Sequence, residues 1–92
     1  IRDRSMDRTN RIALLEVAEI RFNAGDYENA GRYYDTYRTV ARRQSARGLW
    51  LGVRLARETG DRDAEGSYAL ALSNLYPDSA EYQSYKRIQQ SD

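Results

Sequence analysis

Apolar residues recur at helical spacing along almost the whole chain, and turn-forming residues interrupt them at regular intervals. This pattern predicts five helices, over residues 10–24, 27–43, 46–59, 62–76 and 78–89, and no strand. The predicted turns lie at Gly25-Asp26, Gln44-Ser45, Gly60-Asp61 and Pro77. Asp78 precedes Glu81 by three residues, and this spacing predicts that Asp78 caps the last helix.

Each of the first four predicted helices has a stripe of mainly apolar residues that we expect to face a core. These stripes are Leu14, Val17, Ala18 and Arg21; Tyr27, Ala30, Tyr34, Tyr37 and Ala41; Leu49, Val53 and Ala56; and Ala64, Tyr68, Leu72 and Leu75. Most of the eight tyrosines fall at helical spacing, so we expect their rings to pack between helices with the hydroxyl near water.

The chain matches itself at a fixed offset. Gly25-Asp26 recurs as Gly60-Asp61, 35 residues further on, and Tyr68 follows Tyr33 by the same interval. A period of about 34 residues, with two helices and a glycine-containing turn in each unit, is typical of helix-turn-helix solenoids. The sequence therefore predicts an all-α solenoid of about two and a half helix pairs.

The residues around these turns are similar to the tetratricopeptide consensus, at Gly25-Asp26-Tyr27, Ala30 and Tyr34 and again from Gly60-Asp61 through Pro77. Three positions depart from it, because Arg21 replaces an aromatic residue, Arg42 a proline and Glu65 a small alanine. The resemblance implies one tetratricopeptide-like domain fragment. Residues 1–9 are the tail of a preceding repeat or a linker, 10–43 and 46–77 are repeats, and 78–90 form a capping helix.

Composition argues against nucleic-acid binding and catalysis. The 92 residues carry 15 basic and 14 acidic side chains, so the net charge of +1 does not favour a nucleic-acid partner. Without histidine or cysteine, the chain lacks the usual general base and the usual transition-metal ligands, and we expect neither catalysis nor a cofactor.

Residues 61–66 resemble the first half of a calcium-binding loop, but Leu72 stands at the position where such a loop requires a glutamate ligand. Helix capping explains these acids better, and we expect no metal site.

The first helix of each pair in such a solenoid lines a concave surface. Counting from each turn glycine, we expect the partner-binding residues on this surface to be Ile12, Leu15, Glu19, Phe22, Arg47, Trp50, Arg54 and Arg57. An apolar strip beside an arginine strip suits an extended or helical peptide. Alternatively, a further repeat or the last helix covers Phe22 and Trp50.

A narrower resemblance lies in residues 46–56, ARGLWLGVRLA, and residues 75–83, LYPDSAEYQ, together with the earlier strings LEVAE at 15–19 and AGRYYD at 30–35. These strings resemble the C-terminal part of the PilF/PilW family of type IV pilus biogenesis and stability lipoproteins. The resemblance implies a pilotin, a periplasmic protein that is lipid-anchored to the outer membrane and helps the pilus secretin to reach that membrane and multimerise. The chain opens with Ile1, so we expect the anchoring cysteine and further repeats in a preceding part.

Three functions remain in order of preference. The first is a pilotin-like assembly factor that binds the pilus secretin and meets the membrane only through its lipid anchor. The second is a tetratricopeptide scaffold or co-chaperone adaptor that binds a peptide in another assembly system, and the third is an enzyme. A lipid-accepting cysteine in the parent sequence would favour the first over the second. The oligomeric state stays open.

Overall fold

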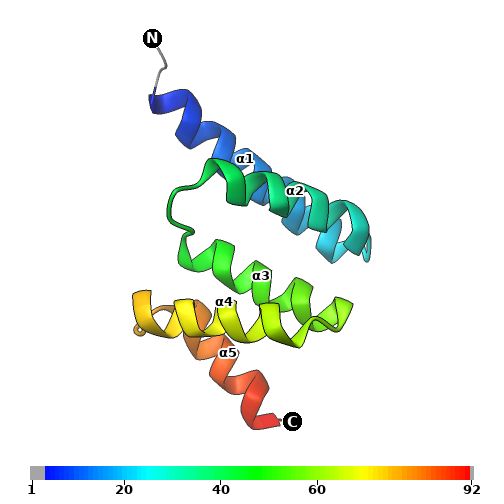
Figure 1. The fold of residues 1–92 in the computed structure, drawn as a ribbon, viewed down its shortest axis with the longest axis vertical. Coiled ribbons are helices and arrows are strands. Elements are labelled where there is room, and N and C mark those ends of the chain that lie inside the picture. Colours follow the sequence, from blue (N-terminus) through cyan, green and yellow to red (C-terminus); the bar gives the residue numbers. More distant parts are fainter. Residues whose placement is uncertain (1–3, 92) are drawn as a thin grey trace. The chain divides into compact units, whose positions relative to one another are not determined.

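The computed structural model describes residues 4–91 and the side chains of residues 10–90. Within residues 4–91 the chain forms five helices and no strand (Figure 1). The helices are α1 (Arg4–Asn23), α2 (Tyr27–Val40), α3 (Ala46–Thr59), α4 (Arg62–Leu75) and α5 (Ala80–Ser91). This confirms the predicted all-α helical-repeat fold.

The chain divides into two compact units. Unit 1 spans Ile1–Arg43 and is the hairpin of α1 and α2. Unit 2 spans Gln44–Asp92 and contains the hairpin of α3 and α4 together with α5, which contacts both of these helices (Figure 1). Each unit therefore has its own helix-helix interfaces, and each is described by itself.

The repeated glycine-aspartate pair closes one helix and starts the next. Gly25 and Gly60 have left-handed backbones, with φ of 82° and 77°, which a residue with a Cβ atom adopts only at an energetic cost. In both turns the amide of the following aspartate donates to a carbonyl of the finished helix at 2.9 Å. This bond satisfies a carbonyl that the helix end would otherwise leave open.

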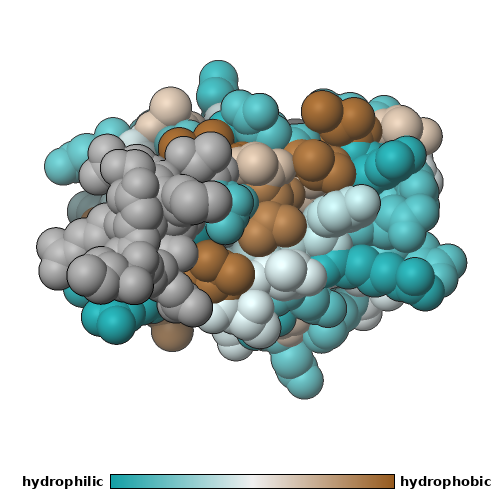
Figure 2. Space-filling view, turned by 90° about the horizontal axis from the view of Figure 1, so that it is seen from above, coloured by the Kyte–Doolittle hydropathy of each residue, from teal (hydrophilic) through white to brown (hydrophobic). Residues whose placement is uncertain are grey.

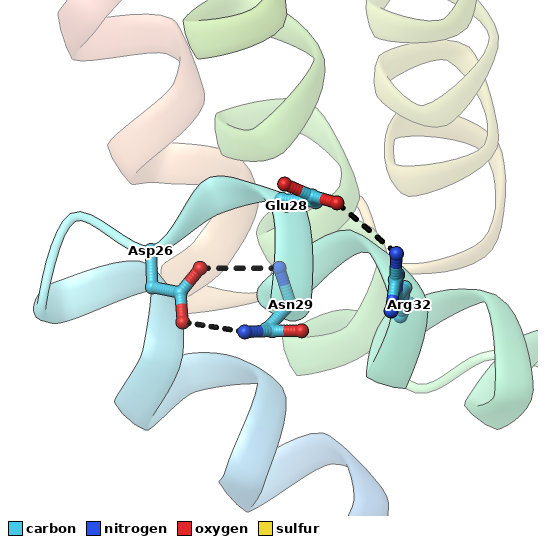
Figure 3. A network of polar contacts seen from close by, with 4 residues as sticks. All are labelled: Asp26, Glu28, Asn29 and Arg32. Carbon is cyan, nitrogen blue, oxygen red and sulfur yellow. Dashed lines mark hydrogen bonds and ion pairs between the residues drawn. The ribbon is translucent and has the colours of Figure 1, made fainter.

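The same aspartates cap the helices that follow. Asp26 accepts the backbone N–H of Asn29 at 3.3 Å and the Asn29 side-chain amide at 2.8 Å (Figure 3). These two bonds lower the pKa of the Asp26 carboxyl, since they stabilise its charged form. Asp61 accepts the N–H of Ala64 at 3.0 Å, so this acid caps α4 as predicted.

The predicted cap of the last helix is wrong by one residue. Ser79, and not Asp78, caps α5, because the Ser79 hydroxyl oxygen accepts the N–H of Tyr82 at 3.1 Å. The same hydroxyl donates to the carbonyl of Tyr76 at 2.8 Å. Ser79 therefore joins the end of α4 to the start of α5. An ionised aspartate could not make both bonds, because it has no proton to donate to a carbonyl.

Two helix ends differ from the prediction by three residues or more, and the other ends agree to within two residues. Helix α1 begins at Arg4 rather than Asn10, because residues 4–9 contain neither proline nor glycine to stop it. Helix α2 ends at Val40, short of Arg43, since Ala41 has an extended backbone. Residues 1–3 of the predicted tail lie outside the described residues.

The core of unit 1 lies between α1 and α2. Helix α2 and its C-cap residue bury four of the five residues of the predicted stripe, and Tyr27 is half-buried. The four are Ala30, Tyr34, Tyr37 and Ala41. Helix α1 buries Leu15 and Ala18, whereas Leu14 and Val17 are half-buried and Arg21 is exposed. The predicted phase of α1 is therefore only partly correct, because Ala18 is buried as predicted but the core also contains Leu15, which lies outside the predicted stripe.

The core of unit 2 is centred on α3. This helix is covered on most of its circumference, and the buried residues Leu51 and Leu55 lie off the predicted stripe of Leu49, Val53 and Ala56. Helix α4 contributes Ala69 and Leu72; its predicted core residue Leu75 is 47% exposed, which corrects that prediction. The buried residues Tyr34 and Tyr37 of unit 1 stand 35 positions before Ala69 and Leu72, so the two units bury equivalent positions.

Candidate functional site

The predicted partner-binding residues of unit 1 differ in their exposure. Ile12 is 50% exposed, while Glu19 and Phe22 are half-buried. The Phe22 ring lies 5.3 Å from the ring of Tyr27, so this aromatic side chain also supports the turn into α2. Leu15 is only 4% exposed and is part of the core, which removes it from the predicted binding surface. A leucine at this position stabilises the hairpin and offers a partner almost no surface.

The predicted residues of unit 2 lie on the narrow solvent-facing side of α3. Arg47, Trp50 and Arg54 are half-buried on a helix whose other sides are buried. Their spacing of three and four residues places them on one face of the helix. We call Arg47, Trp50 and Arg54 the α3 strip.

The guanidinium of Arg54 stacks on the indole of Trp50. The Arg54 Cζ atom lies 5.3 Å from the centre of the Trp50 ring, within the range of a cation–π contact. The Arg54 Nε atom is buried, so the side chain lies along the helix surface. The stack restricts the rotation of both side chains, and it presents an aromatic ring and a planar cation together.

Arg57, the last predicted residue, has a structural contact inside unit 2. Its guanidinium forms an ion pair with Glu65 of α4 at 3.1 Å, and the two side chains are 32% and 19% exposed. Tyr85 of α5 stands close enough for both charges to act on it, and burial, with Glu65 next in size, raises the pKa of the Tyr85 phenol. The Arg57–Glu65 ion pair therefore joins α3 to α4, and the neutral Tyr85 phenol of α5 lies near it.

Glu65 and Tyr85 are not among the predicted site residues. The sequence marks Glu65 only as a departure from a small packing residue. A signal for the ion pair was present, because Arg57 and Glu65 flank the Gly60-Asp61 turn of an antiparallel hairpin and carry opposite charges. Tyr85 could not be assigned, since its role depends on how α5 folds back onto α3 and α4.

A further hydrogen bond joins the start of unit 2 to the C-terminal end of α4. The Tyr76 hydroxyl donates to the carbonyl of Gln44 at 2.8 Å, although the two residues are 32 positions apart. Of the eight tyrosines only Tyr33 is exposed, at 38%, which confirms that these rings mainly pack between helices.

The side chains available for other chemistry are few. Among the residues described, no three acids, histidines or cysteines gather as a metal site would require. No helix in residues 4–91 is long and apolar enough to cross a membrane.

Figure 2 shows a surface on which hydrophobic side chains gather into a patch. The large hydrophobic residues that are exposed are Ile12, Ile20, Tyr33, Val40, Leu70 and Leu75.

No family model matches the chain. The chain is 40% identical over 81 residues to the type IV pilus assembly protein PilF of Pseudomonas aeruginosa, a match that covers 88% of the chain and 32% of that protein. It is also similar to a solved structure from a functional characterisation of Pseudomonas aeruginosa PilF, with a TM-score of 0.79 and 40% identity. That match covers 84% of this chain and 34% of the other, so the chain spans about a third of its relative.

Proposed function

We propose a function for this chain on the premise that it is a tetratricopeptide segment of the PilF family, as its likeness in sequence and fold supports. The segment is a protein-binding part of a type IV pilus assembly factor. Its parent is a pilotin, held at the outer membrane by a lipid anchor outside this segment, and its partner is the secretin of the pilus. The family resemblance supports these finer statements.

The observation that carries the binding role is the stack of Arg54 on Trp50. Tryptophan and arginine are the residues most enriched among the energetic anchors of protein interfaces. Both are half-buried here, on a helix that the core holds firmly, and so keep part of their surface exposed. A rigid helix loses little conformational entropy when a partner binds it.

Binding to the secretin tests the proposal directly. The full-length parent and its Trp50→Ala variant are titrated with purified secretin. We expect the variant to bind about 2 kcal/mol more weakly, which corresponds to a roughly 30-fold higher Kd. Circular dichroism is recorded in parallel, and loss of helicity in the variant would assign Trp50 to the core instead.

Charge reversal provides a second arm with a matched control. Arg54→Glu should weaken binding mainly at low salt, because exposed charge pairs are screened as ionic strength rises. Arg62→Glu makes the same charge change on an exposed position of α4 and should leave the affinity unchanged. If the secretin binds all three variants as tightly as the wild type, the binding site lies outside this segment. If the wild type does not bind the secretin at all, a scaffold or adaptor in another assembly system becomes the better proposal.

Localisation is tested by fractionation of cells that express the parent protein. We expect it in the outer-membrane fraction, together with assembled secretin. A parent protein that stays in the cytosolic fraction would contradict the pilotin role.

A further inference from the structure

Helix α1 has an apolar stripe that lies outside the core of unit 1. Ala13, Val17 and Ile20 follow one another at intervals of four and three residues, which places them on one face of the helix. Ile20 is 64% exposed, Ala13 is exposed and Val17 is half-buried. We call these three residues the α1 seam. Contact of this apolar surface with water is unfavourable, so a covering element would stabilise it.

The second repeat buries the equivalent face. The offset of 35 residues that relates the two repeats carries the α1 seam onto three residues of α3. These are Gly48, Gly52 and Leu55, and all three are buried by other residues of the same chain. The repeat can therefore bury this face within one polypeptide, whereas in α1 the same face is open.

Charged residues border the α1 seam on both sides. Glu16 and Arg21 are exposed and lie at opposite edges of the stripe. An apolar stripe with charged residues at its edges is the arrangement by which one helix packs along another. Arg21 stands where the tetratricopeptide consensus has an aromatic residue, and its exposure places it at the edge of the seam rather than in the core.

We propose that the α1 seam packs against a helix of the parent protein that lies outside these 92 residues. The sequence match covers 32% of the Pseudomonas protein, so a parent of similar length has ample chain to supply this helix. Burial of the equivalent α3 face within one chain favours a helix of the same polypeptide over a second copy or the secretin. This inference rests on the family membership that underlies the proposed function, and not on secretin binding.

Thiol labelling measures whether the seam is covered. The chain contains no cysteine, so a single introduced thiol marks one position of it. Ile20→Cys is compared in the 92-residue chain and in the full-length parent without secretin. A maleimide is the label, and peptide mass spectrometry locates it. We expect labelling at least about tenfold slower in the parent, because a covered residue reacts only when the structure opens locally.

Leu70→Cys is the matched control. Leu70 is also a large apolar residue and is 62% exposed. Its equivalent in the first repeat is Asp35, which is exposed as well, so the repeat leaves this position open. Leu70→Cys should therefore react at similar rates in the chain and in the parent. If Ile20→Cys lowers the stability of the parent, hydrogen exchange of the two unmodified proteins replaces it, and the α1 amides should exchange about tenfold more slowly in the parent.

Four results would overturn the inference. The first is the same labelling rate of Ile20→Cys in the chain and in the parent, and the second is an equal slowing of Leu70→Cys in the parent. The third is slow labelling of the 92-residue chain that becomes faster on dilution, since a second copy would then cover the seam. The fourth is protection in the parent that appears only after secretin is added.

The proposed function fails or stands separately. If the seam is protected in the parent while changes in the α3 strip leave secretin binding unaltered, only the proposed binding site fails. If the seam is open in the parent while those changes weaken secretin binding, only this inference fails.

Discussion

Leu72 and Leu70 lie on the same helix but in opposite environments, which makes them a matched pair for testing the core. Leu72 is fully buried between the helices of unit 2, whereas Leu70 is 62% exposed. Leu72→Ala removes three carbon groups from the core. At about 0.8 kcal/mol for each buried group the lost transfer energy is roughly 2.4 kcal/mol, and the cavity left behind raises the expected cost to about 3–4 kcal/mol.

Urea denaturation of the two variants measures this difference. Circular dichroism reports on all helices, and Trp50 fluorescence reports on unit 2. We expect Leu72→Ala to lower the unfolding midpoint of unit 2 strongly, because the free energy of unfolding of a small domain is itself only about 5–15 kcal/mol. Leu70→Ala should change it by no more than about 0.5 kcal/mol. Similar midpoints for the two variants would refute the burial pattern of α4.

Ser79→Ala should destabilise α5 by about 1 kcal/mol, because it removes the helix cap. Hydrogen exchange should then show faster exchange of the backbone amides of α5, and an unchanged exchange pattern would contradict the capping role of Ser79. Gly66→Ala on α4 meets no atom within 4 Å of the new Cβ and should raise stability by about 0.5–1 kcal/mol, whereas Gly60→Ala should lower it because of its φ of 77°. Denaturation midpoints that move in the same direction for both glycine variants would contradict this reasoning. The pKa of the Asp26 carboxyl is lowered in the folded protein, so its ionised form stabilises unit 1. This stabilisation is present when the pH is above the ordinary pKa of 3.8, and it is lost as the pH falls through the pKa of the folded state. Asp26→Asn keeps a capping side chain but cannot titrate, so acid unfolding of unit 1 should depend less on pH in that range, and an identical pH profile would exclude this contribution.

The number of helices and most turns can be predicted from the sequence, because they depend on backbone conformation and hydrogen bonds between residues close together in the chain. Gly25 and Gly60 adopt left-handed backbones that other residues avoid, and each is followed by an aspartate that caps the next helix. The bounds of α3 agree with the prediction at both ends for the same reason, since Ser45 accepts the N–H of Gly48 and Gly60 ends the helix. These signals act over a few residues and need no tertiary contact.

The site was only partly predictable. The spacing placed Trp50 and Arg54 together on the solvent-facing side of α3, and the structure brings them into contact. Helical periodicity alone did not determine which side of α1 faces the core, because apolar residues occupy a wide arc of that helix. Leu15 was therefore assigned to the surface, although it is 4% exposed.

Only the tertiary structure decided the role of Arg57. From its position on α3 this arginine was expected to bind a partner, but the folding of α4 against α3 brings Glu65 within 3.1 Å. The packing of α5 then adds Tyr85 to the same cluster. Local sequence determines where each helix begins and ends, since hydrogen bonds and backbone angles act between neighbours. Which side chains remain available to a partner depends on what the other helices cover, and that is determined when the helices pack together.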